Sequence, residues 1–220
     1  MKNIMLPLLS MAIILCSCRS MTSFDTPNSF RNMQGTVFLS NGKTVDGKII
    51  VNSSNRLSSP VKVYTEGDRK PMQFGLSDVS GYSIRGDYYA LKQVRGNLSL
   101  GRQQYFMKRI SRPESRIHLF EHIEKVNSTN SRNVTTSRYE TQYFLQMPGD
   151  ASNEVWSLSG SRFVPNFDEK MSKLVADCPS LAARISSKAE GYFYAQVTMF
   201  GEKRADVLLR IIDDYNACGR

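Results

Sequence analysis

Hydrophobic and polar residues alternate along much of the chain between residues 34 and 165, as they do in strands that bury one face. The first example is GTVFLSNGKTVDGKIIV, in which two alternating runs flank Asn41-Gly42, a dipeptide that strongly predicts a hairpin turn. A second hairpin is predicted around Arg85-Gly86-Asp87. Further strands are predicted at 61–66, 71–76, 103–110, 117–126, 139–147 and 154–159. Short strands at this spacing predict an antiparallel meander that closes toward a barrel or a sandwich.

The hydrophobic period changes after residue 165 from that of strands to that of helices. Two short helices are predicted in NFDEKMSKLVADCPSLAARISSK, with Asn166 as the N-cap of the first and Pro179 in the first turn of the second. A terminal helix is predicted from four apolar residues at helical spacing, namely Leu208, Ile211, Ile212 and Tyr215. We therefore expect an α+β fold, with a β-rich part followed by a short C-terminal helical segment.

The N-terminus carries an apolar run, Ile4 to Leu15, that is too short to span a bilayer and follows Lys2. This pattern predicts that residues 1–17 are an export signal. The run ends in LCSC, which is similar to the lipobox of bacterial lipoproteins. The resemblance implies cleavage before Cys18 and attachment of acyl chains such as palmitate to Cys18. Cys16 does not fit the pattern, because it would place bulky Leu15 directly before the cleavage point.

Lipidation at Cys18 would attach the chain to a membrane of the cell envelope, and we expect it on the periplasmic side. Two or more acyl chains give lasting attachment, whereas one chain gives only marginal binding at about 0.8 kcal/mol per buried methylene. The alternative is an ordinary secreted protein that is cut nearby. Residues 18–33, rich in Ser, Thr, Asn and Met, are predicted to be a flexible tether. The β-rich module is then expected at 34–165 and the helical segment at 166–220.

The two cysteines outside the N-terminal region, Cys178 and Cys218, are predicted to form a disulfide, which an oxidising compartment permits. Closing a loop of about 40 residues would stabilise the fold by about 4 kcal/mol in the chain-entropy model. The alternative is a reactive cysteine with a histidine base. Neither cysteine has neighbouring residues that would lower the pKa of its thiol.

Composition and charge narrow the classes of partner. The chain has 220 residues, of which 40% are hydrophobic, enough to form a core and to disfavour a disordered chain. Its formal net charge is +9, and removal of residues 1–17 would take away only Lys2 among the charged residues. Such a balance favours anionic partners. In an envelope these would be glycans or lipids rather than nucleic acid, although a solvated basic surface without a ligand explains the same charge.

Basic and aromatic residues are interleaved between Arg85 and Arg116, a composition that can bind anionic ligands through charge and stacking. The candidate anionic-ligand patch consists of Arg102, Lys108, Arg109, Arg112 and Arg116. A simpler explanation is alternation along strands, with aromatic residues inward and Arg and Lys, including Lys92, outward. No nucleic-acid partner is expected.

The pentapeptide HLFEH, His118 to His122, matches the H-x-x-E-H pattern of inverted zinc peptidases. In such enzymes the two histidines lie one helical turn apart and Glu121 would act as the general base. Residues 117–123 instead alternate as in a strand, in which His118 and His122 would be about 13 Å apart, too far to share a metal ion. We therefore expect strand histidines and no cofactor. No phosphate-binding glycine loop or G-x-S-x-G motif occurs.

Several segments together resemble an uncharacterised group of exported proteins and lipoproteins from Bacteroidota. They are FLSNGKTVDGKI, LSDVSGYSIRGDYYAL, QYFLQM, DCPSLAARI and IIDDYNAC, spread over most of residues 34–218. These are turn and core patterns, so the resemblance implies no functional residues. The sequence predicts a non-catalytic, lipid-anchored envelope protein that binds or supports other envelope components. The alternatives are an envelope hydrolase, zinc-dependent through His118, Glu121 and His122, and a binder of anionic glycan or lipid.

Overall fold

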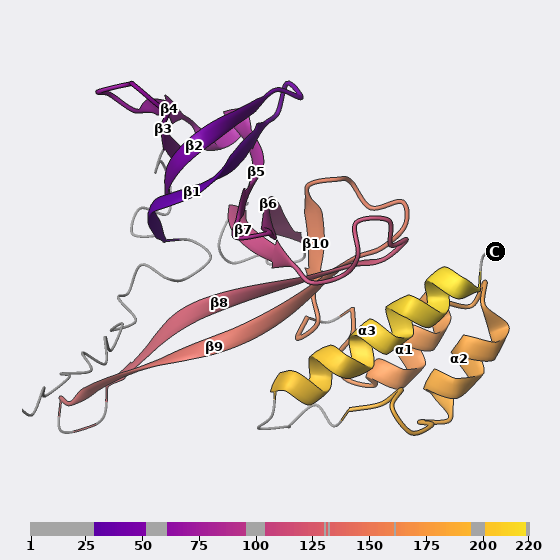
Figure 1. Ribbon diagram of the computed structural model, residues 1–220. Helices are drawn as coiled ribbons and strands as arrows, with labels where there is room; N and C mark the ends of the chain where they lie inside the picture. The colour runs from indigo at the N-terminus through magenta and orange to yellow at the C-terminus, as the bar shows by residue number, and fades with distance from the viewer. Residues whose placement is uncertain are drawn as a thin grey trace, which may run out of the picture.

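One bent sheet and three helices make up the described part of the protein (Figure 1). The computed structural model describes residues 29–51, 61–95, 104–129, 131, 133–160, 162–194 and 201–218. The predicted signal, Cys18 and Arg102 lie outside these residues. The strands are β1 (Phe30–Leu39), β2 (Thr44–Val51), β3 (Val61–Tyr64), β4 (Met72–Phe74), β5 (Val79–Ile84), β6 (Asp87–Arg95), β7 (Gln104–Arg109), β8 (His118–Thr129), β9 (Thr135–Gln146) and β10 (Glu154–Ser157). The helices are η1 (Leu76–Asp78), α1 (Phe167–Leu174), α2 (Pro179–Ser186) and α3 (Gly201–Ala217). The predicted α+β class is confirmed.

The N-terminal half of the sheet follows the predicted hairpins. Strands β1 and β2 pair around Asn41-Gly42, where Gly42 has a φ of 82°, a conformation that glycine adopts easily. However, β1 begins at Phe30, so the predicted tether boundary at residue 33 is wrong. Phe30 is only 7% exposed, and its ring lies 5.8 Å from that of Tyr82 and 5.3 Å from that of Tyr89. These partners lie far along the chain, so local composition could not reveal them.

Strands β6 to β10 close into a small cylinder. Each of β6 to β9 pairs antiparallel with the next, β10 pairs antiparallel with β9, and β10 also pairs parallel with β6. The closing register places Glu154 opposite Gln93 and Val155 opposite Val94. We call these five strands the cylinder. Its inner face is the face of the strands that carries Ala90, Met107, Phe120, Phe144 and Val155. Closure is the arrangement that the meander of predicted strands favoured.

Three buried clusters lie on successive layers of the structure, because β6 to β9 each bury both faces. The N-terminal core comprises Phe30, Val37, Ile49, Val51, Val61, Val63, Val79, Tyr82, Ile84, Tyr89, Leu91 and Phe106. The cylinder core comprises only Ala90, Met107, Phe120, Phe144 and Val155. The helical core lies between the helices and the outer face of β8 and β9, and includes Leu119, Leu145, Phe163, Phe167, Met171, Ile185, Leu208, Ile211, Ile212 and Tyr215.

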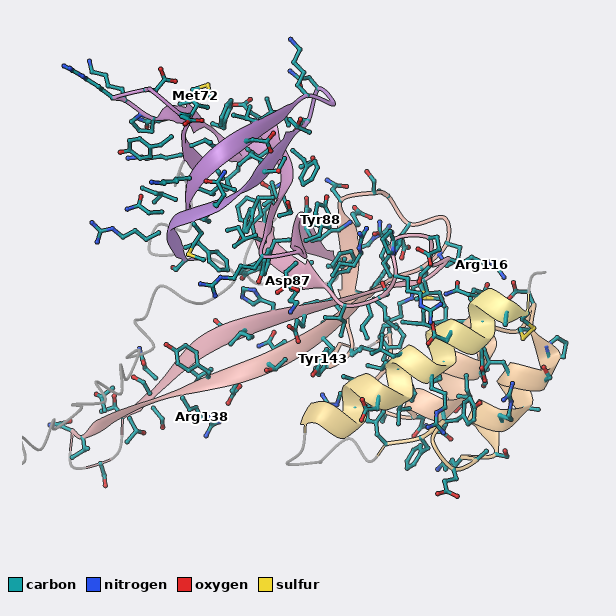
Figure 2. All side chains as sticks on the ribbon, viewed as in Figure 1. Met72, Asp87, Tyr88, Arg116, Arg138 and Tyr143 are labelled. Atoms are coloured by element: carbon teal, nitrogen blue, oxygen red, sulfur yellow. A yellow bond between two sulfur atoms is a disulfide. The ribbon has the colours of Figure 1, made fainter. Side chains whose placement is uncertain are left out.

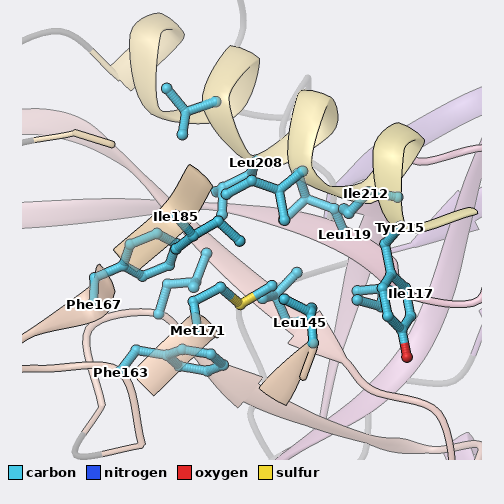
Figure 3. Packing of buried hydrophobic residues seen from close by; sticks show 14 of the residues in the cluster. Ile117, Leu119, Leu145, Phe163, Phe167, Met171, Ile185, Leu208, Ile212 and Tyr215 are labelled. Atoms are coloured by element: carbon cyan, nitrogen blue, oxygen red, sulfur yellow. The ribbon is translucent and has the colours of Figure 1, made fainter. Parts of the chain in front are cut away.

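The helical segment packs as its sequence predicted. Figure 3 shows Phe167, Met171 and Ile185 facing side chains of α3 and of the sheet. All four residues of the predicted terminal stripe are at most 3% exposed, and Pro179 occupies the first turn of α2. A disulfide joins Cys178, before α2, to Cys218, after α3, which confirms the predicted pairing. Within the described residues, no helix has both the length and the apolar composition needed to cross a bilayer.

Strands β8 and β9 continue beyond the cylinder as a long hairpin (Figure 1). The predicted strands ended at residue 126 and began again at residue 139, but these bounds are too short, because β8 reaches Thr129 and β9 begins at Thr135. The polar side chains support the ladder: the hydroxyls of Thr129 and Thr135 are 3.0 Å apart, and Ser137 donates to Asn127 Oδ1 at 2.7 Å. Cross-strand polar pairs of this kind stabilise a sheet that little apolar burial supports.

Candidate functional site

The inner face of the cylinder contains a buried lysine. Lys92 of β6 is 7% exposed, and the side chains on its face of the strand, Ala90 and Val94, pack with the cylinder core. The prediction that the basic residues of this region point outward is therefore wrong for Lys92. Lysine is seldom buried without an acidic partner, yet no carboxylate of the described residues forms an ion pair with Lys92.

Neutral groups hold the Lys92 ammonium in place. Lys92 Nζ donates to Gln146 Oε1 at 2.9 Å and to the Ser152 carbonyl at 2.5 Å, and it lies 4.7 Å from the centre of the Phe120 ring. Gln146 is oriented in turn, because its Nε2 donates to the Ala151 carbonyl at 2.8 Å. Burial, and to a smaller extent the nearby charge of Arg109, lowers the pKa of Lys92 to about 8. The site therefore contains a cation whose charge is only partly compensated.

Arg109 of β7 lies on the same inner face, two residues after the core residue Met107. Its guanidinium is 4.8 Å from the centre of the Tyr88 ring, a cation–π contact. In the described ranges Arg109 pairs with no carboxylate. It differs in this respect from Lys108, which points to the other face and pairs with Asp87 at 2.9 Å.

An open hollow of about 470 Å³ lies beside Arg109, where the β1–β2 turn meets β5, β6 and β7. Its lining includes two cations, Lys43 and Arg109, and two aromatic side chains, Phe38 and Tyr88, whose rings are 5.5 Å apart. The remaining lining residues are Leu39, Gly42, Ser80 and Ser83, so no acidic residue of the described chain faces the hollow. A ligand here would meet positive charge, hydroxyl groups and aromatic surface. Tyr88 is labelled in Figure 2, above the junction of the cylinder and the N-terminal sheet.

The two histidines lie on β8, as the alternating pattern predicted, and not on the helix that a zinc peptidase requires. His118 pairs with Gln146 and His122 with Gln142, so both histidines share the inner face with Phe120, whereas Glu121 belongs to the opposite face. Burial lowers the pKa of His118, and the charges of Arg109 and Lys92 lower it further. The described residues contain no group of three His, Cys, Asp or Glu side chains positioned to hold a metal ion.

Two further contacts fix the histidines. The Ser111 Oγ lies 3.4 Å from His118 Nδ1, but that hydroxyl oxygen also accepts a hydrogen bond from the Leu119 amide at 3.0 Å. Ser111 is 7% exposed, so its hydroxyl is not presented to a ligand. The ring of His122 packs 4.9 Å from that of Tyr105, and burial lowers the pKa of His122. Both histidines are held neutral near pH 7 by these surroundings.

The four described residues of the predicted patch do not form one surface. Arg102 lies outside the described residues, and Lys108 and Arg109 point to opposite faces of β7. Arg112 and Arg116 belong to the β7–β8 connection and contact the helical segment: Arg112 lies 3.9 Å from Asp213, and Arg116 lies 2.9 Å from Asp177 and 4.2 Å from the Tyr215 ring centre. Of the described members, only Arg109 reaches the hollow.

The structure thus assembles a different set, which we call the inner-face cations: Lys92 and Arg109, with Lys43 across the hollow. Lys92 lies at period-two spacing between Ala90 and Val94, a signal of the core face that the prediction of outward lysines did not use. Lys43, in a turn, carried none. Comparison with known proteins found no matching family model, no matching curated protein and no matching solved structure.

Proposed function

We propose that this chain is a lipid-anchored protein of the cell envelope whose folded part binds an anionic group, without catalysis. The observation that carries the proposal is the exclusion of described carboxylates from the surroundings of Lys92 and from the hollow beside Arg109. Burying Lys92 costs free energy that apolar packing would not. A bound carboxylate or phosphate would offset that cost.

Binding rather than reaction is supported by the groups that the inner face supplies. Arg109 and Lys43 offer positive charge and hydrogen-bond donors, and Tyr88 and Phe38 offer aromatic surface. An arginine stacked on an aromatic ring is held in one orientation, which lowers the entropic cost of engaging a planar carboxylate or a phosphate. The ligand chemistry that fits is therefore a carboxylate or phosphate carried by an envelope glycan or lipid.

The location in the envelope rests on the N-terminal pattern and on the disulfide. Disulfides persist in oxidising compartments such as the periplasm, and Cys178–Cys218 is consistent with export. The anchor itself is inferred from the lipobox resemblance at Cys18. Intact-mass measurement of protein from the native host tests it: we expect a chain that begins at Cys18 and carries the mass of acyl chains, and a chain with free Cys18 would contradict the anchor.

Binding can be tested with two anionic probes on the chain from Arg19 to Arg220, which contains every described residue. One probe is a vesicle of phosphatidylglycerol in phosphatidylcholine, and the other is polygalacturonate. Binding to one probe only would identify the source of the anion. We expect that binding to weaken with salt, because exposed charges are screened over about 8 Å at physiological ionic strength.

Two charge reversals separate the hollow from a general basic surface. Arg109→Glu should weaken binding at least about tenfold, because it replaces a cation of the hollow by an anion. Arg112→Glu changes the net charge equally, but Arg112 does not line the hollow, so binding should change little. Equal losses in the two variants, or retention by both, would contradict a site at Arg109.

A further inference from the structure

Outside the cylinder, no further strand of the described ranges pairs with the hairpin of β8 and β9. Strand β7 pairs with β8 only at Phe120 and Glu121, and β10 pairs with β9 only at Phe144 and Leu145. From His122 and Gln142 outward, the ladder therefore has two strands in the described chain. We call this segment, His122–Thr129 with Thr135–Gln142, the arm. An isolated two-stranded ribbon is marginally stable in water, and its edges offer unpaired backbone groups to a further strand.

The β9 side of the arm is exposed over much of its length. Every residue from Thr135 to Tyr139 is exposed, and Glu140 and Gln142 nearer the cylinder are partly covered. Tyr139 has 54% of its surface exposed, and Figure 2 shows the neighbouring Arg138 out on the arm, well away from Tyr143 at its base. Neither strand contains a proline or a bulge in its pairing, two of the features that protect an edge strand, and the charged side chains on β9 are Arg138 and Glu140.

The described charges on the arm place two carboxylates opposite each other. Glu140 lies directly opposite Glu124, and like charges in this position destabilise a sheet. Arg138 contacts Glu140 at 2.5 Å within the same strand, and Gln142 donates to Glu124 at 3.2 Å. Among the described side chains, Glu140 thus has an arginine partner, whereas Glu124 has the neutral amide of Gln142. A second cation beside Glu140 would offset the repulsion between the two carboxylates.

We propose that the arm pairs with the arm of a second copy of this chain, β9 against β9, about a two-fold axis through Tyr139. In this antiparallel register each Arg138 lies opposite Glu140 of the partner subunit, and the two Tyr139 side chains adjoin. An axis through Arg138 or through Glu140 would instead place like charges opposite each other. The Tyr139 register also matches the length of the β9 side of the arm, since it pairs Thr136 with Gln142 of the partner subunit.

The expected self-association is weak in solution, because the paired segment is short and polar. Attachment of both copies to one membrane, which rests on the proposed lipid anchor, would raise their effective concentration. The pairing itself does not depend on the anchor or on the anion site. It can therefore be tested on the soluble chain from Arg19 to Arg220.

The first test is sedimentation equilibrium over a series of protein concentrations. The series should reach about 1 mM, because a weak complex can have a dissociation constant of that size. We expect a monomer–dimer equilibrium. Arg138→Glu and Glu140→Arg should each raise the dissociation constant about tenfold or more, because each creates two like-charge pairs. The double variant should restore association, since it exchanges the charges on both sides of the axis. As a control, Arg69→Glu in the exposed β3–β4 turn should leave association unchanged.

Cysteine cross-linking tests the register. The only described cysteines are joined in a disulfide, so Tyr139→Cys introduces a single free thiol in that part of the chain. It should form a disulfide-linked dimer on mild oxidation, whereas Thr136→Cys, which the register places opposite Gln142 of the partner subunit, should not. A monomer at all concentrations, association insensitive to the charge reversals, or equal cross-linking at both positions would overturn the proposal.

Discussion

The two cores on either side of β8 and β9 differ in what they bury. The helical core is apolar over nineteen buried residues and is closed by a disulfide. The cylinder core has five buried apolar residues, and the neighbouring inner face adds Lys92, Gln146 and His122 as buried polar side chains. The same two strands supply both cores through alternate residues. The difference indicates that the helical core stabilises the fold, whereas the inner face retains polar groups at a cost in stability.

The largest loss of stability should follow from a cavity in the helical core. Phe167 is 2% exposed, and its ring lies 4.7 Å from that of Tyr194. Phe167→Ala should lower the free energy of unfolding by about 3–5 kcal/mol, the usual cost of such a deletion. Chemical denaturation would measure it, and a loss below about 1 kcal/mol would contradict the role given to this core.

Loss of the disulfide should lower the free energy of unfolding slightly less than Phe167→Ala does. Replacing Cys178 and Cys218 together by Ser should cost about 2–4 kcal/mol, because the cross-link restricts the unfolded chain. Denaturation of the variant against wild-type protein gives the value. Reduction of the wild-type protein should produce a similar loss, and agreement between the two measurements would exclude an effect of the serines themselves.

Lys92 should make stability depend on alkaline pH. Its pKa is about 8 in the fold against 10.5 as the ordinary value, so between these pH values the unfolded chain binds a proton that the folded chain lacks. The contribution of Lys92 to the free energy of unfolding should therefore rise by up to about 3 kcal/mol as pH increases through this window. Lys92→Met should remove the rise.

The quantity to compare is the free energy of unfolding of the wild-type protein minus that of Lys92→Met, measured at each pH. Burial also raises the pKa values of Tyr82 and Tyr89, which makes stability fall at higher pH in both proteins, and the subtraction cancels that contribution. A difference that does not vary with pH would mean that Lys92 titrates normally and is not buried as described.

The smallest effect should come from His122 at acid pH. Burial lowers its pKa, so as pH falls below about 6.5, the unfolded chain is protonated while the folded chain stays neutral. The free energy of unfolding should then fall with decreasing pH. His122→Phe, which keeps an aromatic ring against Tyr105, should show a shallower decline in urea denaturation between pH 7 and 5.

Local features of the sequence predicted local parts of the structure well. Asn41-Gly42 predicted the first hairpin, the stripe from Leu208 to Tyr215 predicted the buried face of α3, and Pro179 marked the start of α2. Each depends on residues close together in the chain. The alternation around His118 likewise predicted a strand rather than a metal-binding helix.

Features that depend on distant residues were not predictable in the same way. The meander favoured closure but not the strands that close it: β6 pairs with β10, about sixty residues later in the chain, and no residue in either strand signals the pairing. Phe30 is buried by Tyr82 and Tyr89, so a tether was predicted where β1 begins. Arg112 and Arg116 looked like neighbours of Arg109, but their acidic partners on the helical segment draw them to another part of the surface.

The central claim is that the inner-face cations hold an anion. The most direct test is to measure the pKa of Lys92 by NMR of its ε-methylene group, with and without the anionic probe that binds. We expect a pKa of about 8 in the free protein and a clear rise with the probe at saturation, because a nearby anion stabilises the charged ammonium. A pKa that is the same in both states would contradict the proposal that the inner-face cations hold an anion.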